Sequence, residues 1–471
     1  MYYRMRENIL FRQYPGHGYI TDNSEYGYRM LNDKRKILGE RYVTASGAMM
    51  LCMLHTTARS IDDIVAELMQ IFHGVDFDTL KQDAVEFYNL FVEDGFLCYG
   101  ESKEACENEA WPESSVTDDI PSSTGIITNE CAGGEINQNE FLRSIHIDIA
   151  DACNERCVHC YIPNECKKNI IDPALFYRII EEGRRMNIIH VTLSGGEPLL
   201  HRDIISFLKR CKDLDLSVNV LSNLTLLSGE IIAEMKRNPL LSVQVSLYSM
   251  NADVHDSITN LPRSFERTKA GIIRLLDEGI PVQISCPIIK QNIDSFTDVL
   301  HWGWEHNIAV ATEPVIFAAY DHSGSNLDNR LSLSEVSEVI KAQMQEGYSE
   351  AIRSTATEKE KLTANDPICS ICRYSFCVTA TGKVFPCAGW QNNVIGDLNT
   401  QSVLEVWEKS EKIKELRQIK WSSFPTCLSC EDRGYCTVCM MCNSNENVDG
   451  DPFRLNPHRC GVAALTHSMV G

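Results

Sequence analysis

The sequence predicts an α/β protein whose central part is a partial barrel of parallel strands with helices outside. Two observations carry this prediction: short apolar strands alternate with amphipathic helices between residues 140 and 320, and polar segments stand at or just after the ends of several of these strands. Six strand–helix units, rather than eight, predict an open, TIM-like (β/α)6 barrel. The predicted strands are Ser144–Ile149, His190–Leu193, Ser217–Leu221, Ser242–Leu247, Val282–Pro287 and Val310–Val315, and the predicted helices are Pro173–Met186, Ile204–Lys212, Gly229–Arg237, Phe265–Asp277 and Phe296–His306.

A small winged-helix-like domain is predicted before the barrel, in residues 1–99. Its opening, Asn8–Ile20, predicts two short strands around Pro15 and Gly16, and Phe96–Tyr99 predicts a last strand. Apolar residues at helical spacing predict three helices between them. These helices are Ser46–His55, Ser60–Phe72 and Phe77–Asp94.

Three further segments complete the predicted organisation. Residues 100–139 are acidic, rich in Glu, Ser, Thr and Asn, and lack periodicity, which predicts a flexible linker. Residues 140–320 form the barrel, residues 321–368 a bridging helical segment, and residues 369–471 a cysteine-rich domain.

Charge and hydropathy narrow the partners of this protein. The 471 residues carry a formal net charge of −21, which argues against binding a nucleic-acid backbone or an anionic membrane. No apolar run approaches the length of a transmembrane helix, and the first residues lack a signal-peptide core. We therefore expect a cytoplasmic protein that binds neither nucleic acid nor membrane.

The 20 cysteines predict metal or cluster binding, because structural disulfides are rare in a reducing compartment. Cys153, Cys157 and Cys160 have the spacing C-x3-C-x2-C. Three thiolates can hold a [4Fe–4S] cluster and leave its fourth iron open to a small molecule. Ten more cysteines lie between residues 369 and 460, and most of the others are expected to be ordinary thiols.

Polar segments follow the predicted strands, where barrels of this kind place their active sites. These segments are the cysteine loop, Gly195–Pro198, Ser222-Asn223 and Ser246. The cysteine spacing and Ser194-Gly-Gly-Glu-Pro-Leu199, each after a strand and in this order, resemble the radical S-adenosylmethionine (SAM) superfamily. That resemblance implies cluster ligation by Cys153, Cys157 and Cys160. It assigns SAM contacts to Tyr161, Gly195, Gly196, Glu197, Pro198, Ser222, Asn223 and Ser246.

The resemblance also implies a mechanism. One electron from the cluster would cleave SAM, and the resulting 5′-deoxyadenosyl radical would abstract a hydrogen from the substrate. Within the SAM site, Glu197 is expected to face the ammonium group and Ser246 the carboxylate. Some relatives add a basic residue three positions after a His-Asp pair, whereas this chain has Thr259 there. A flavodoxin- or ferredoxin-type protein is the expected electron donor.

The C-terminal cysteines resemble a SPASM domain, which binds two auxiliary [4Fe–4S] clusters and brings the expected total to three. This resemblance rests on two spacings, Cys369-x12-Gly382-x4-Cys387 and Cys427-x2-Cys430-x5-Cys436. The resemblance assigns Cys427, Cys430, Cys436 and Cys460 to the second auxiliary cluster, and Cys369, Cys387 and Cys439 to the first. The fourth ligand of the first is Cys372, Cys377 or Cys442, or is absent. Zinc sites are the alternative.

Residues 1–99 resemble the RiPP recognition element, in which a leader peptide adds as a strand to a small sheet. A DNA-binding winged helix and a plain packing domain are the alternatives. Together the three parts resemble maturases of ribosomally made precursor peptides, most closely those that form Cys thioether crosslinks to carbon. Other possibilities are a carbon–carbon crosslinking or epimerising maturase, a sulfatase-type or quinohemoprotein maturase, and a non-catalytic iron–sulfur electron carrier or peptide scaffold.

Overall fold

The computed structural model describes residues 1–113 and 141–471, which form two compact units. Within the described residues, the first unit contains residues 1–27 and 32–113, and the second contains residues 28–31 and 141–471. Each unit has its own hydrophobic core. In these two ranges we find no helix with the length and hydrophobicity that spanning a bilayer requires.

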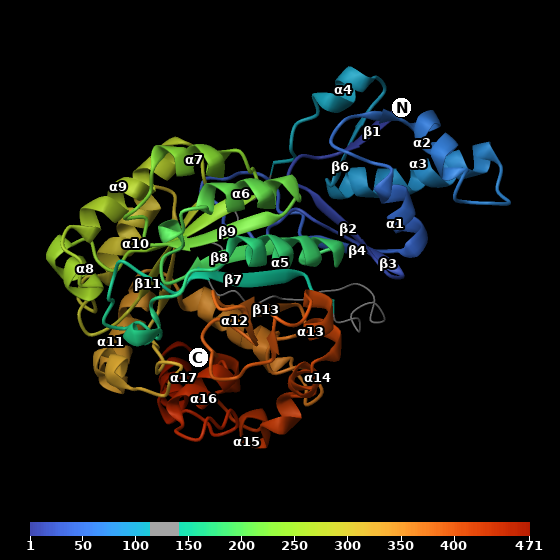
Figure 1. The fold of residues 1–471 in the computed structure, drawn as a ribbon. Helices are drawn as coiled ribbons and strands as arrows, with labels where there is room; N and C mark the ends of the chain where they lie inside the picture. Colours follow the sequence, from blue (N-terminus) through green and yellow to red (C-terminus); the bar gives the residue numbers. More distant parts are fainter. Residues whose placement is uncertain (114–140) are drawn as a thin grey trace. The chain divides into compact units, whose positions relative to one another are not determined.

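The first unit combines two small sheets with three main helices (Figure 1). Capping side chains set the helix starts: Thr44, Ser60 and Asp76 each accept a backbone N–H of the first turn. Gly95 ends the long helix in the left-handed conformation that glycine tolerates best. One sheet has the order β2-β3-β4 (Leu10–Tyr14, His17–Thr21, Glu40–Thr44), the other β5-β1-β6 (Arg59–Ser60, Tyr2–Met5, Leu97–Gly100), and the helices are α1 (Ala45–Cys52), α2 (Ile61–Leu68) and α3 (Phe77–Asp94).

The start of the predicted linker is folded, because α4 spans Lys103–Glu107 and its Cys106 is fully buried. Two arginines of the first strand region hold this segment. Arg4 Nε donates to the Cys106 carbonyl at 3.0 Å, and Arg6 donates to the Ala110 carbonyl at 2.7 Å. Contacts between residues so far apart in sequence produce no local pattern from which the helix could be predicted. The rest of the predicted linker, from residue 114 onward, lies outside the described residues.

A parallel sheet forms the centre of the second unit. All six predicted strands occur, and neighbours in sequence pair in parallel. They are β7 (Ser144–Ala150), β8 (His190–Gly195), β9 (Ser217–Ser222), β10 (Leu241–Ser246), β11 (Val282–Pro287) and β12 (Ala309–Glu313). The connecting helices are α5 (Pro173–Arg185), α6 (Ile204–Asp213), α7 (Gly229–Lys236), α9 (Ser264–Asp277) and α10 (Phe296–Glu305), together with α8 (Ala252–Thr259), which was not predicted.

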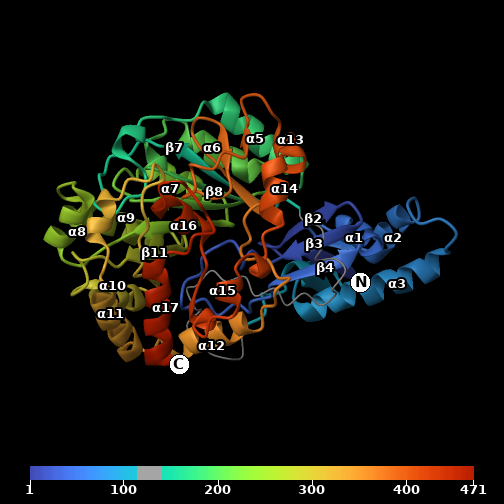
Figure 2. The same cartoon turned by 90° about the horizontal axis from the view of Figure 1, so that it is seen from below.

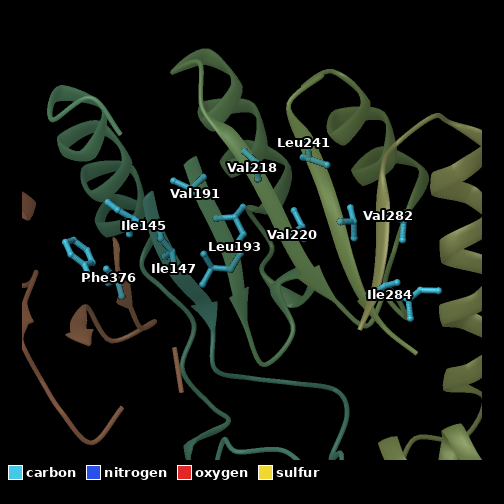
Figure 3. Packing of buried hydrophobic residues seen from close by; sticks show 14 of the residues in the cluster. Ile145, Ile147, Val191, Leu193, Val218, Val220, Leu241, Val282, Ile284 and Phe376 are labelled. Atoms are coloured by element: carbon cyan, nitrogen blue, oxygen red, sulfur yellow. The ribbon is translucent and has the colours of Figure 1, made fainter. Parts of the chain in front are cut away.

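Alternation along these strands decides which side chains meet the helices. Residues such as Ile145, Val191 and Val218 are fully buried and belong to one continuous core with the helices outside the sheet (Figure 3). Their neighbours along the strands point to the opposite face because side chains alternate in a strand. That second face is polar at several positions, including Gln244 and Ser246.

The C-terminal cysteine-rich region continues the barrel sheet. Strand β13 (Ser375–Val378) pairs in parallel with β7, and β14 (Lys383–Phe385) and β15 (Gly396–Asp397) follow in antiparallel order. Figure 2 shows α17 (Pro457–Val470) beside α11 (Leu333–Gln345), which lies in the predicted bridging segment. The remaining helices are α12 (Ser349–Glu360), α13 (Val403–Lys409), α14 (Glu411–Arg417), α15 (Pro425–Leu428) and α16 (Met440–Glu446), and 3-10 turns occur at Asn164–Cys166, Pro198–Leu200, Ser325–Asn329, Trp421–Ser423 and Arg433–Tyr435.

The ring pair between α5 and α6 offers a test of the barrel core. Phe176 and Phe207 are fully buried and stack with their centroids 3.8 Å apart. Phe176→Ala should destabilise the protein by about 3–5 kcal/mol, because it leaves a cavity in a packed layer. Thermal unfolding followed by near-ultraviolet circular dichroism should show a lower midpoint. Leu404→Ala is the control, since Leu404 is 47% exposed; equal midpoints for the two variants would contradict this packing.

Candidate functional site

A cavity of about 320 Å³ opens at the carboxyl ends of the parallel strands. Its wall takes residues from the loops or ends of all six strands from β7 to β12. Nine of the residues predicted from the sequence line it. They are Cys153, Cys157, Cys160, Tyr161, Gly195, Gly196, Ser222, Asn223 and Ser246. Glu197 and Pro198 are buried and do not line the cavity.

The cysteine loop is held by backbone hydrogen bonds to the end of α8. Arg156 N–H donates to the Thr259 carbonyl and Val158 N–H to the Ile258 carbonyl, both at 2.9 Å. Thr259 is fully buried, and its hydroxyl lies 2.7 Å from Ser264 Oγ. Thr259 therefore supports the loop through its backbone, and its side chain has a partner away from the cavity.

Burial makes the thiols of this loop weak acids. It raises the pKa of Cys153 to about 12 and that of Cys157 well above its usual value. Cys157 Sγ lies 3.4 Å from a Glu155 carboxylate oxygen and 3.9 Å from the Tyr248 hydroxyl. Metal ligation requires thiolates, so an iron cluster here would have to displace protons that the protein alone retains. Three thiols on one loop beside a cavity fit a cluster with one open iron.

Two glycines let the end of β8 lie against the cysteine loop. Gly195 has φ +120°, and a Cβ on Gly196 would overlap the carbonyl oxygens of Asp151 and Ala152. The close approach forms two hydrogen bonds, from Gly196 N–H to the Ala150 carbonyl (2.6 Å) and from Glu197 N–H to the Ala152 carbonyl. The sequence argument placed a ligand against these glycines; here they also allow one loop to meet another.

Glu197 joins β8 to the loop after β9. Its carboxylate accepts hydrogen bonds from Leu199 N–H (2.9 Å), Ser222 Oγ (2.8 Å) and Asn223 N–H (2.8 Å). The side chain is fully buried, and burial raises its pKa to about 7. In this arrangement the carboxylate accepts hydrogen bonds from groups of the protein itself, whereas the sequence predicted that it would face the ammonium group of SAM.

The polar loop after β9 is tied to the cysteine loop as well. Asn223 Nδ2 donates to Asn154 Oδ1 at 3.0 Å, and Asn154 Nδ2 donates to Thr225 Oγ1 at 2.7 Å. Tyr161, on the opposite side of the motif, packs on Phe317 with ring centroids 5.3 Å apart. Hydrogen bonds thus join the loops after β7, β8 and β9 at this side of the cavity.

Several wall residues were not predicted. Glu155, His159 and Lys167 flank the cysteines, Tyr248 follows β10, and Glu313 ends β12. The only sequence signal for the first three is their closeness to the motif, since charged residues near cysteines are common on surfaces. Burial keeps His159 neutral by lowering its pKa to about 4, and it raises the pKa of Glu155 to about 7.

The C-terminal cysteines gather into two groups. Cys427, Cys430, Cys436 and Cys460 interact electrostatically with one another, and so do Cys369, Cys387 and Cys439. These are the two sets that the sequence assigned to auxiliary clusters. A further thiol, Cys442, hydrogen-bonds to Cys439 and lies 3.6 Å from Arg459.

The other two candidates for the fourth ligand lie on or near β13. Cys377 Sγ is 3.8 Å from Asp148 Oδ2 on β7, and it also interacts with the Cys387 thiol. Its ligand atom and those of Asp148 and His146 lie within 4.8 Å of one another. Cys372 is fully buried, and its carbonyl accepts a hydrogen bond from Arg417.

The loop contact at Gly196 gives a specific prediction. Gly196→Ala should weaken SAM binding at least about tenfold, because a methyl group there forces the β8 loop away from backbone that cannot yield. Equilibrium dialysis with labelled SAM after anaerobic reconstitution measures this. Gly229→Ala is the matched control, since the nearest atom to its Cβ would be 3.9 Å away. Unchanged SAM affinity in Gly196→Ala would contradict the tight loop contact.

Glu197 gives a second prediction. Glu197→Ala should lower the thermal midpoint as well as SAM affinity, because it leaves the Ser222 and Asn223 donors of a buried loop without their acceptor. A loss of about 1–3 kcal/mol is expected for each unsatisfied buried donor. Glu197→Gln keeps an acceptor oxygen and should retain more stability. A variant with wild-type melting and only reduced SAM affinity would mean that Glu197 acts on the ligand alone.

Comparisons with known proteins agree with this geometry. Residues 147–303 match the model of the radical SAM superfamily, and residues 369–431 match that of the iron–sulfur cluster-binding SPASM domain. The chain is 27% identical over 326 residues to the AdoMet-dependent heme synthase of Methanosarcina barkeri, covering 63% of this chain and 90% of that protein. It is 22% identical over 336 residues to the PqqA peptide cyclase of Bradyrhizobium diazoefficiens, covering 66% and 85%.

A solved structure resembles nearly the whole chain. Streptococcus suis SuiB, bound to its precursor peptide SuiA, superposes with a TM-score of 0.61 at 13% identity, covering 97% of this chain and 100% of that one. This likeness concerns the fold. The identification rests on the two family matches, on the cysteine loop at the strand-end cavity and on the enzymes among the relatives. The chain is a radical SAM enzyme with a SPASM domain, and it uses SAM and iron–sulfur clusters.

Proposed function

We propose that this enzyme matures a ribosomally made precursor peptide by linking a cysteine sulfur to a carbon of the same peptide. The observation that carries the proposal is the gathering of the C-terminal thiols into two groups within the unit that holds the strand-end cavity. The fold likeness to SuiB, whose structure contains a precursor peptide, and the relatives named as PqqA peptide cyclases support a peptide substrate.

The cavity residues have distinct parts in this proposal. Cys153, Cys157 and Cys160 hold the first cluster, which with SAM supplies the abstraction of a hydrogen atom from an unactivated carbon. Ser222 and Asn223 would contact the ribose, and Gly195 and Gly196 would bring the β8 backbone to the amino acid end of SAM. Tyr161, which packs on Phe317, would lie near the adenine.

The chemistry balances if an auxiliary cluster accepts an electron. Forming a carbon–sulfur bond from a C–H and an S–H group releases one hydrogen atom, one proton and one electron. The hydrogen atom would leave with the cleaved cofactor, and an oxidised cluster held by the C-terminal cysteines would accept the electron. The proton passes to a carboxylate of the cavity, where Glu155 and Glu313 are available. Two auxiliary clusters would bring the total to three.

In the first auxiliary group, the identity of the fourth ligand decides whether one iron would be open to substrate. Cys369, Cys387 and Cys439 form its centre, and Cys372, Cys377 and Cys442 compete for the fourth position. Cys377 is engaged with Asp148, and Cys442 with Cys439. A cluster held by Cys369, Cys387 and Cys439 alone would keep one iron open, and a substrate thiolate could bind there before the carbon–sulfur bond forms.

The first unit is proposed to bind the leader of the precursor peptide. Among the described residues β4 pairs with β3 alone, so its other edge can accept an additional strand. Arg41 Nε on β4 lies 3.3 Å from Asp94 Oδ2 at the end of α3, so this strand lies near the end of the long helix. Leu90 on α3 is 60% exposed and offers an apolar contact to a peptide lying along the helix.

The iron content tests the cluster assignment. Wild-type protein reconstituted anaerobically should hold about twelve irons, and the Cys153/Cys157/Cys160 triple alanine variant about eight. Iron and acid-labile sulfide are measured for each chain. The variant should also lose SAM cleavage with dithionite. About four irons falling to none, with zinc bound, would mean that the C-terminal cysteines are zinc sites, and the thioether proposal would fail.

Leader binding has a separate test. Leu90→Glu should weaken binding of a fluorescein-labelled leader segment from a cysteine-containing precursor peptide that the enzyme modifies, because it puts a charge where an apolar contact is expected. Fluorescence anisotropy measures this binding. Val448→Glu is the control, since Val448 is 94% exposed in the other unit. SAM cleavage should persist in both variants, and equal leader affinities would refute the α3 contact.

Mass spectrometry of that precursor decides the reaction itself. A thioether product loses a pair of hydrogen atoms, and its cysteine no longer reacts with iodoacetamide. A product of the same mass whose cysteines all react would instead indicate a carbon–carbon crosslink. An unchanged mass in H2O, together with a gain of one deuterium when the reaction is run in D2O, would indicate epimerisation.

A further inference from the structure

Lys167 is a buried lysine at the cavity that the site described so far does not use. It follows the 3-10 turn Asn164–Cys166, and its backbone N–H donates to the Asn164 carbonyl. The side chain lines the cavity and the residue is only 7% exposed. In residues 1–113 and 141–471 we find neither a hydrogen bond nor an ion pair from its ammonium group.

The surroundings of Lys167 place it at the cluster end of the cavity. It interacts electrostatically with Cys153, Glu155 and His159, all of which belong to the cysteine loop. His159 is neutral because its pKa is lowered to about 4. Glu155 does not reach ion-pair distance of Lys167, and it lies against Cys157, with its other oxygen lacking a partner.

A buried ammonium group is costly unless an anion compensates its charge. Among the described residues that line the cavity, Lys167 is the one lysine or arginine. The ligand that this wall is assigned to bind has a single anionic group, its carboxylate. Thr259, where some relatives place a basic residue, is fully buried and hydrogen-bonded to Ser264.

We propose that Lys167 binds the carboxylate of SAM and so holds its methionine end against the open iron. This inference rests on the proposed SAM site. The pairing compensates the lysine charge, and its second effect is to orient the sulfonium toward the substrate side of the cavity. Ser246, which the sequence assigned to the carboxylate, lines the same cavity and can donate a further hydrogen bond.

Ligand affinities test this positioning role without relying on turnover. On reconstituted protein, Lys167→Met should weaken binding of SAM and of S-adenosylhomocysteine about 30-fold or more, because one partner of a buried charge pair is removed. Binding of methylthioadenosine, which has the nucleoside and the sulfur but no carboxylate, should be unchanged. Lys167→Arg keeps the charge and should recover part of the SAM affinity.

The control is the neighbouring residue. Lys168 is exposed, so Lys168→Met changes the net charge equally and should leave all three affinities unaltered. Iron content and the cluster absorbance of each variant verify that the cysteine loop is intact. The spectral change of the reduced cluster on adding SAM, followed by electron paramagnetic resonance, should need correspondingly more SAM in Lys167→Met.

Each other outcome has a definite meaning. SAM affinity within twofold of wild type in Lys167→Met overturns the proposal, as does an equal loss for methylthioadenosine, which would mean a structural role. Reduced affinity for the precursor peptide with normal SAM affinity would assign the lysine to substrate and also overturn it. If wild-type protein binds neither SAM nor methylthioadenosine, the SAM site itself is wrong, which is a separate failure.

Discussion

The contact between the cysteine loop and the end of β8 is the constraint on which the site depends. Gly196 N–H and Glu197 N–H donate to the carbonyls of Ala150 and Ala152, so two loops that follow adjacent strands become one piece of backbone. Glycine is required because any side chain at Gly196 would collide with main-chain atoms that have no room to move. The cysteines can then sit at a cavity without a long, mobile loop.

Buried polar groups extend this constraint around the cavity. The Glu197 carboxylate fixes Ser222 and Asn223 after β9, and Asn223 reaches back to Asn154 in the cysteine loop. On the other side, the last carbonyls of α8 accept hydrogen bonds from the backbone N–H groups of Arg156 and Val158. Each bond is modest, but a network of this kind is rigid when every member has its partner. Rigidity matters here because hydrogen abstraction depends on where the reacting carbon lies.

Burial determines which residues of the cavity wall are charged, whereas the loop contacts determine its shape. Burial disfavours thiolate at Cys153 and Cys157, carboxylate at Glu155 and imidazolium at His159, so the wall has little charge of its own. Lys167 is the exception, and a ligand with one carboxylate is its natural complement. Because the charges of this wall are balanced only when iron and SAM are bound, we expect tight binding of both and a lower stability of the site without them.

Much of this could be predicted from the sequence, because strands, helices and metal motifs are local patterns. All six barrel strands and the helix Phe77–Asp94 follow from periodicity, and the cysteine spacing with the Gly-Gly-Glu segment identified the superfamily. Features that depend on distant partners were missed. Strand β13 is four residues long and pairs with the distant β7 as well as with β14, and α4 is held by Arg4 and Arg6.

The sequence by itself determined the fold class and which cysteines are available as ligands. Only the tertiary structure decided that Glu197 bonds to the β9 loop, that Cys377 meets Asp148, and that Lys167 is buried at the cavity. The physical reason is that burial and hydrogen-bond partners are properties of the packed chain. A lysine in a polar stretch has the same local sequence whether it ends in water or against the cluster end of a cavity.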